Sequence, residues 1–206
     1  QHANTQESHH AGSIPAWVRL LGVCVLLAGL LGGCAGGPTR VQGAFVVVLG
    51  VAQDGGAPQA GNFADPRWDR PGQARQVACL GIVDPRSGGR WMIDATPDFR
   101  RQLTDLYRAA READPDAPPR PVVDGVFLTH AHIGHYTGLM FLGHESIGAD
   151  GVPVYAMPAM REFLAGNGPW DQLVRYENIE LRALAAGEPG ALAEDLQVTP
   201  FLVPHR

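Results

Sequence analysis

Apolar runs along the chain alternate with polar stretches rich in glycine and proline, and this pattern predicts strands first and helices later. Residues 44–49, 77–83 and 91–94 are short apolar runs of the kind that forms buried strands. The glycine-containing turn at 84–89 predicts that the second and third of these strands form a hairpin. A Thr-Pro-Asp sequence at 96–98 then predicts the start of a helix. The apolar face of this helix consists of Phe99, Leu103, Leu106, Tyr107 and Ala110.

Beyond a linker at 114–119, strands alternate with helices. The predicted strands lie at 122–129, 152–156, 178–184 and 196–203, and the predicted helices begin near His135, at 158–165 and at 170–176. Strands that first pair as hairpins and then alternate with helices indicate a mixed fold of the α+β class. The connection at 53–75 is longer than most loops, which is typical of functional or mobile segments.

The N-terminal segment has the pattern of an export signal. Residues 20–31 are apolar but too few to span a bilayer comfortably; Arg19 precedes them, and a Gly-Gly-Cys sequence ending at Cys34 follows. We therefore expect residues 1–40 to be an export signal with a spacer, and residues 41–206 to form the folded domain.

Composition narrows the function classes. A chain of 206 residues suits one domain with a targeting segment, and its formal net charge of -5 argues against a nucleic-acid binder that works by neutralising phosphates. Only Cys79 falls in the expected domain, so we predict no disulfide framework and a buried thiol. Because the chain stops at Arg206 directly after a strand-like run, we expect a domain truncated at its C-terminus, with apolar surface and a strand edge exposed.

Histidines at the end of an apolar strand carry the candidate chemistry. His130, His132 and His135 follow one another at spacing i, i+2, i+5. Side chains alternate along a strand, so His130 and His132 are predicted to point the same way. Gly134 allows a sharp turn that brings His135 back at the start of the next helix. Neutral imidazoles suit zinc, iron, copper or nickel, so the spacing predicts a metal site at this strand end.

Aspartates in three other segments are further candidates. Asp94 ends the third strand, where it either orients a metal histidine or serves as a turn residue. Asp54 follows Gln53 in a glycine-rich loop, where it is either a loop ligand or part of a plain Asp-Gly turn. Asp98 is explained by capping the helix that follows it.

These motifs resemble the metallo-β-lactamase superfamily. The sequence Thr-His-Ala-His-Ile-Gly-His at 129–135 is similar to the family motif His-x-His-x-Asp-His. The strand ending in Asp94 and the Val-Pro-His sequence ending in His205 also resemble family strands that reach the metals. Residues 49–59 and 91–100 are similar to the branch that contains the pyrroloquinoline quinone (PQQ) biosynthesis protein B. The resemblance implies a four-layer αββα sandwich.

The resemblance also implies a ligand set. His130, His132 and His205 would form a first metal site with a water in the fourth position, and His135 would belong to a second site. Asp94 and His135 are the candidate catalytic residues. The implied cofactor is Zn²⁺, as one ion or two, with iron or manganese as alternatives. The implied partner is a small-molecule substrate, and no nucleic acid is expected.

The implied reaction is hydrolysis by a metal-bound hydroxide, with an ester, a lactone or a phosphodiester as the substrate class. Gly134 stands where the family motif has an aspartate ligand, so a second metal requires Asp54 or a downstream residue as a substitute. Two alternatives stay open. One is an oxidative metal enzyme like the PQQ protein B branch, and the other is a metal-binding lipoprotein without catalysis, which Gly134 favours.

A shorter resemblance concerns the export signal. The sequence Leu-Gly-Gly-Cys at 31–34 is similar to the bacterial lipobox, in which the cysteine becomes the lipidated N-terminus. The resemblance implies lipidation of Cys34 and a lipid anchor on the periplasmic face of a bacterial membrane. The alternative to a lipobox is an ordinary signal peptide, or an apolar anchor that happens to contain a cysteine. The alternative localisation is a periplasmic or secreted protein.

Overall fold

The structure is a computed structural model that describes residues 41–117 and 122–204. The predicted export signal, with Cys34, and the candidate ligand His205 lie outside the described residues. Within the described ranges, no helix is long and apolar enough to cross a membrane.

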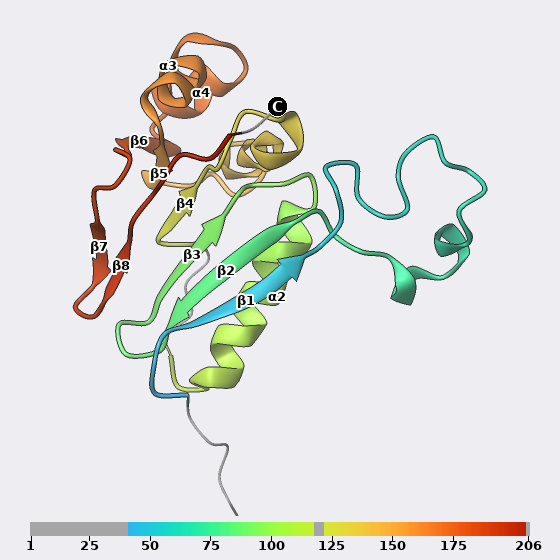
Figure 1. Cartoon of the computed structure of the whole chain (residues 1–206), viewed down its shortest axis with the longest axis horizontal. Coiled ribbons are helices and arrows are strands. Elements are labelled where there is room, and N and C mark those ends of the chain that lie inside the picture. Colours follow the sequence, from blue (N-terminus) through green and yellow to red (C-terminus); the bar gives the residue numbers. More distant parts are fainter. Residues whose placement is uncertain (1–40, 118–121, 205–206) are drawn as a thin grey trace, which may run out of the picture. The chain divides into compact units, whose positions relative to one another are not determined.

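One mixed sheet forms the centre of the described domain (Figure 1). Its strands, in spatial order, are β1 Phe45–Gly50, β2 Cys79–Asp84, β3 Gly89–Ile93, β4 Gly125–Phe127, β5 Val152–Ala156 and β6 Ile179–Ala183. The strands from β1 to β3 pair antiparallel, whereas those from β3 to β6 pair parallel. This switch confirms the prediction of hairpins followed by alternating strands and helices. A separate antiparallel pair, β7 Gly190–Ala193 and β8 Leu196–Val198, follows the sheet in the chain.

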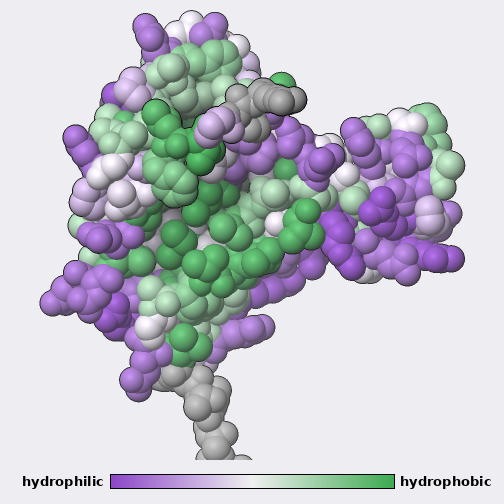
Figure 2. All heavy atoms as spheres, in the orientation of Figure 1, coloured by the Kyte–Doolittle hydropathy of each residue, from purple (hydrophilic) through white to green (hydrophobic). Residues whose placement is uncertain are grey.

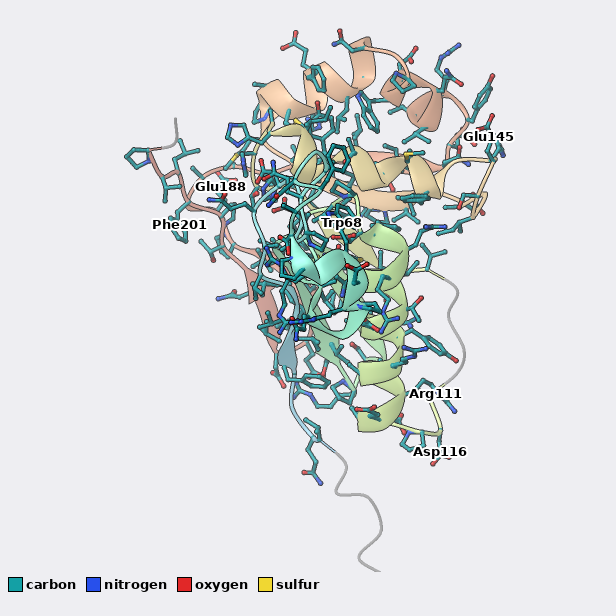
Figure 3. All side chains as sticks on the ribbon, turned by 90° about the vertical axis from the view of Figure 1, so that its right-hand side faces the viewer. Trp68, Arg111, Asp116, Glu145, Glu188 and Phe201 are labelled. Atoms are coloured by element: carbon teal, nitrogen blue, oxygen red, sulfur yellow. The ribbon has the colours of Figure 1, made fainter. Side chains whose placement is uncertain are left out.

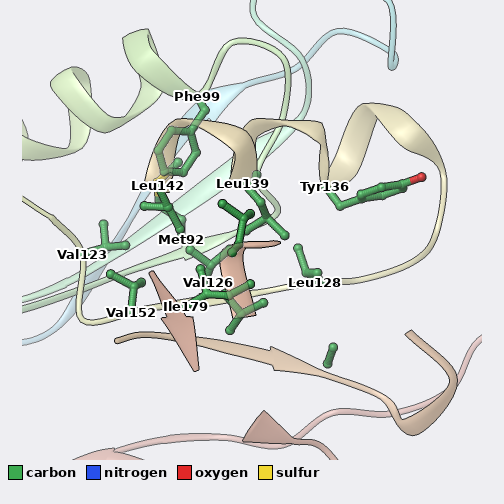
Figure 4. Packing of buried hydrophobic residues seen from close by; sticks show 14 of the residues in the cluster. Met92, Phe99, Val123, Val126, Leu128, Tyr136, Leu139, Leu142, Val152 and Ile179 are labelled. Carbon is green, nitrogen blue, oxygen red and sulfur yellow. The ribbon is translucent and has the colours of Figure 1, made fainter. Parts of the chain in front are cut away.

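Helices cover one face of this sheet, and the main core lies between the two layers. The longer helices are α2 Phe99–Ala113, α3 Pro158–Gly166 and α4 Trp170–Arg175. Phe99 and Leu106 of α2 are fully buried, whereas Tyr107 is 38% exposed at the margin of the predicted apolar face. In Figure 4, Phe99 lies above Met92 of β3 and Leu142, so the helix start is fixed against the middle of the sheet.

The start of α2 differs from the prediction. The helix begins at Phe99, and Asp98 occupies the cap position without a side-chain capping bond. Thr96 Oγ1 instead accepts the Asp98 N–H at 3.1 Å. The Asp98 carboxylate accepts the Val77 N–H at 2.8 Å. Asp98 is therefore the N-cap residue by position, as predicted, but its side chain ties the helix start to the segment entering β2 instead of capping the helix.

The segment after β4 is not the α-helix that the sequence predicts near His135. It forms two short 3₁₀ helices, η3 Ile133–His135 and η4 Thr137–Leu142. The Gly138 N–H donates to Ala95 O at 2.8 Å, and a Cβ at Gly138 would lie only 2.3 Å from Thr96 O. This close packing against the end of β3 sets the local geometry, because backbone contacts with a distant segment outweigh helix propensity.

The other face of the sheet carries an apolar surface. Strand pairing places Val46 beside Ile82, and Ile82 beside Trp91, on the side away from α2. Side chains of the β7–β8 pair pack on the Ile82 and Trp91 end of this row. Val46 and Val48, on the edge strand β1, are 61% and 63% exposed. Figure 2 shows hydrophobic residues gathered on the face that is turned toward the viewer.

This exposed face should bind a hydrophobic dye. Replacing Val46 and Val48 together by threonine is expected to lower the fluorescence of bound anilinonaphthalene sulfonate and to leave the melting temperature nearly unchanged, because both side chains are already in water. Val47→Thr is the matched control, since Val47 packs against the core, and it should cost about 1–3 kcal/mol of stability. Equal stability losses for the two faces would contradict this assignment of the strand's sides.

Candidate metal centre

The three motif histidines lie together in the loop and the 3₁₀ helix η3 that follow β4. The strand ends at Phe127, so His130 and His132 are not strand residues, and the alternation argument for their common side is wrong. Their ring centroids nevertheless lie 4.6 Å apart, and the rings of His130 and His135 lie 4.2 Å apart. The loop and η3, rather than the strand, gather these imidazoles.

Asp94 holds both ends of this histidine loop. The residue follows β3, is 5% exposed and has a φ of 70°, a left-handed conformation that aspartate tolerates better than most residues. Its carboxylate accepts the Thr129 N–H at 2.8 Å and the Thr129 hydroxyl at 2.8–2.9 Å. It also accepts a hydrogen bond from His135 Nδ1 at 2.7 Å. One buried carboxylate therefore fixes the residue before the loop and its last histidine.

The same bonds assign the protons of two imidazoles. A carboxylate only accepts hydrogen bonds, so His135 must carry a proton on Nδ1. Because the Thr129 hydroxyl donates to Asp94, it accepts from His130 Nδ1, which lies 2.9 Å away. Neutral His130 then has its lone pair on Nε2. Hydrogen bonds of this kind orient the histidines of metal sites.

Asp54 reaches the histidines from the long connection at 53–75. Its Oδ1 lies 3.1 Å from His135 Nε2, and its Oδ2 lies 3.6 Å from His132 Nδ1. The hydrogen bond from His135 is the main cause that lowers the pKa of the Asp54 carboxyl below its ordinary value. Figure 3 views the molecule from the side of this connection, with Trp68 marking it. The neighbouring Gln53 is exposed and has no assigned part in the cluster.

A cavity of about 490 Å³ opens beside Asp54. Arg75 and Arg101 bring positive charge to its wall, and Asp54 and Asp98 bring negative charge. The cavity is thus lined by polar groups of both signs and lies next to the histidine cluster.

Cys79 lies near this region but is not a ligand candidate. Its side chain is buried, with Sγ 3.6 Å from Asp94 O, and burial raises the pKa of the thiol far above its ordinary range. This confirms the expectation of a buried thiol.

The donor set fits a divalent cation in its chemistry but not in its present arrangement. Across the described ranges, no group of three or more His, Cys, Asp or Glu side chains is already arranged to hold a metal ion. The donor chemistry does fit, because imidazole nitrogens and a carboxylate oxygen are zinc ligands and lie in contact here. His205, the remaining expected ligand, lies outside the described residues.

The sequence did not predict a role for Thr129 at the site. It bonds both Asp94 and His130, so it links the end of β3 to the first motif histidine. A hydroxyl residue directly before the first histidine was the available signal, but its partner Asp94 is 35 residues away in sequence.

Comparisons with known proteins show related folds. A family model described as "Beta-lactamase superfamily domain" matches residues 90–206. The chain is similar to the crystal structure of Zn²⁺-bound PqqB from Methylobacterium extorquens, with a TM-score of 0.60 and 25% identity over 77% of this chain and 56% of that one. It is also similar to a diphosphatase from the PhnP family, with a TM-score of 0.48 and 23% identity over 72% and 53% of the two chains. No curated protein matches it. The chain thus spans little more than half the length of either solved structure.

Removing the Asp94 carboxylate should loosen the histidine loop even without a metal. For Asp94→Ala in the presence of EDTA, the free energy of unfolding in urea is expected to fall by about 3 kcal/mol, because the Thr129 and His135 donors lose a buried acceptor. Asp94→Asn should lose less, since it keeps one acceptor oxygen.

The exposed Asp69→Ala serves as the control and should stay within about 0.5 kcal/mol of the parent chain. Equal stability of the Asp94 and Asp69 variants would show that the carboxylate does not hold the loop.

Proposed function

The chain belongs to the metallo-β-lactamase superfamily and is similar to Zn²⁺-bound PqqB, and we propose that it is a metal-dependent hydrolase with its metal centre at the histidine loop. The observation that carries this proposal is that the rings of His130, His132 and His135 lie together. The buried carboxylate of Asp94 orients this cluster through its hydrogen bond with His135. His205 is the proposed further ligand. The zinc in the PqqB structure supports Zn²⁺ as the cofactor.

Asp94 and Thr129 orient the histidines of the proposed metal centre. Asp94 keeps a proton on His135 Nδ1 and, through the Thr129 hydroxyl, keeps one on His130 Nδ1. Nε2 is then the nitrogen of each ring that would bind a cation, and on His135 this atom faces Asp54 Oδ1 at 3.1 Å. A bound divalent metal lowers the pKa of its water and polarises a carbonyl or phosphoryl oxygen, which is the chemistry that hydrolysis needs. Asp94 and His135 are therefore the residues on which activity should depend, with Asp94 acting through its partners.

The proposed substrate is a small molecule with an ester, lactone or phosphodiester bond. The mixed-charge cavity beside Asp54 supports a polar substrate, because Arg75 and Arg101 line it, although Arg101 also pairs with Asp105 at 3.0 Å. The resemblance of residues 49–59 and 91–100 to the PQQ protein B branch keeps a second candidate open, an oxidative metal enzyme. The two candidates differ in the metal that they require.

Metal analysis of the purified full chain separates these candidates. We expect about one zinc per chain or more by elemental analysis, its loss in His132→Ala, and its retention in His144→Ala. His144 is the matched control because it is an exposed histidine that contacts Tyr176, outside the cluster. Zinc together with hydrolysis of a panel of esters, lactones and phosphodiesters would support the proposal.

Iron with oxygen consumption would instead favour the oxidative candidate. Stoichiometric metal without turnover of any ester, lactone or phosphodiester would point to a metal-binding protein without catalysis. A full chain with no bound metal would overturn the proposal.

We also propose that the protein is a lipoprotein exported to the periplasmic face of a bacterial membrane, with Cys34 as the lipidated residue. The support is the lipobox-like sequence at 31–34 after a short apolar run. In a bacterial host, Cys34→Ala is expected to abolish incorporation of labelled palmitate and to release the protein from the membrane fraction. Cys24→Ala, within the apolar run, should change neither. Unchanged labelling of Cys34→Ala would contradict this localisation.

A further inference from the structure

We propose that Asp54 is a ligand of the same metal centre, and that Gly134 is the residue that admits it there. The inference rests on the proposed function, because it presupposes that the histidines bind a metal. It adds a ligand from a distant segment and a reason for the glycine inside the histidine motif.

The first observation is that one carboxylate touches two of the three histidines. The two oxygens of Asp54 face different rings, Oδ1 toward His135 Nε2 at 3.1 Å and Oδ2 toward His132 Nδ1 at 3.6 Å. Asp54 and His135 are 81 residues apart in sequence, so only the tertiary fold brings them together. A carboxylate oxygen among imidazole nitrogens is a common zinc donor set.

The second observation concerns space at Gly134. A Cβ at this position would lie 2.6 Å from Asp54 Cβ and 3.0 Å from both Asp54 Cα and O. Two of these neighbours are backbone atoms, which cannot turn away as a flexible side chain can. The backbone of Gly134 does not have a positive φ, so its own conformation does not demand glycine. Its missing side chain therefore serves the close approach of Asp54.

The third observation is that the segment carrying Asp54 is held at both ends. The Val51 and Ala52 N–H groups donate to Gln76 O at 3.0 and 2.9 Å. Ala57 and Arg75 exchange hydrogen bonds of 3.0 and 2.6 Å. Residues 53–56, between these pairs, are therefore fixed against the segment that leads into β2. Asp54 reaches the histidines from a loop that backbone hydrogen bonds hold at both ends.

The orientation of the His135 ring supplies the fourth argument. His135 lies between two carboxylates, Asp94 at Nδ1 and Asp54 at Nε2. Asp94 fixes the Nδ1 side of the ring, so Nε2 is the nitrogen that faces the Asp54 carboxylate. A divalent cation bound there would have an imidazole nitrogen and a carboxylate oxygen as ligands.

The competing account is that Asp54 only accepts a hydrogen bond from His135 and has a structural role. Asp54→Asn separates the two accounts, because asparagine keeps an acceptor oxygen of similar shape and loses the charge. Gly134→Ala tests the second half of the proposal, since its methyl group should push the Asp54 segment away from the histidines.

The test is the Zn²⁺ dissociation constant of the full chain, measured by competition with a chromophoric chelator. Asp54→Asn and Gly134→Ala should each weaken Zn²⁺ binding at least about tenfold. The double variant should bind no more weakly than Asp54→Asn alone, because Gly134 acts through Asp54. Asp69→Asn, an exposed aspartate of the same connection, should bind like the parent chain. Melting temperatures measured without metal identify any variant that has lost its fold. If Gly134→Ala does not fold, Asp54→Asn still tests whether Asp54 is a ligand.

Each other outcome is decisive. Parent-like Zn²⁺ binding by Asp54→Asn, with loss in His132→Ala, overturns the role of Asp54 and leaves the proposed function standing. Additive losses in the double variant show that Gly134 acts independently, which overturns its admitting role. A parent chain that binds no Zn²⁺ overturns the proposed function, and this inference falls with it.

Discussion

The candidate centre depends on one buried carboxylate. Asp94 stands at the end of β3 in a left-handed conformation and bonds Thr129 on one side of the histidine loop and His135 on the other. Because β3 and β4 are parallel neighbours, their ends meet at the same sheet edge, and a single side chain can reach both ends of the loop. The orientation of two imidazoles follows from this contact, so the fold positions donors for a cation without an α-helix to carry them.

Close backbone approach is the second constraint. Gly138 allows η4 to pack directly on the end of β3, and Gly134 allows the Asp54 segment to pack directly on the histidine loop. At both positions the space that a Cβ would fill is already occupied by another segment. The loop is therefore held between β3 on one side and the 53–75 connection on the other. Both glycines serve close packing rather than chain flexibility.

Local patterns predicted most of the fold because the strands are short apolar runs and α2 has one apolar face. The failures lie where tertiary contacts decide. The 3₁₀ helices η3 and η4 replace a predicted α-helix through bonds to Ala95, and the side chain of Asp98 bonds Val77 instead of capping its own helix. The β7 strand carried no strong apolar signal and was missed.

At the site, too, local sequence spacing predicted some features, whereas tertiary contacts decided the others. The spacing of His130, His132 and His135 predicted that they lie together. The reason given for His130 and His132 was wrong, since these two residues lie in a loop rather than on a strand. The bond between Asp94 and Thr129 and the contact of Asp54 with two histidines join segments far apart in sequence. No spacing rule reveals such contacts, because they depend on how β3, β4 and the long connection pack.

The most direct test of the central claim is X-ray absorption at the zinc edge of the zinc-loaded full chain. The account predicts nitrogen and oxygen neighbours at about 2.0–2.1 Å with the outer-shell scattering of several imidazoles, and no sulfur at about 2.3 Å. A first shell of water oxygens without imidazole scattering, or a sulfur ligand, would contradict a metal centre built on the histidine loop.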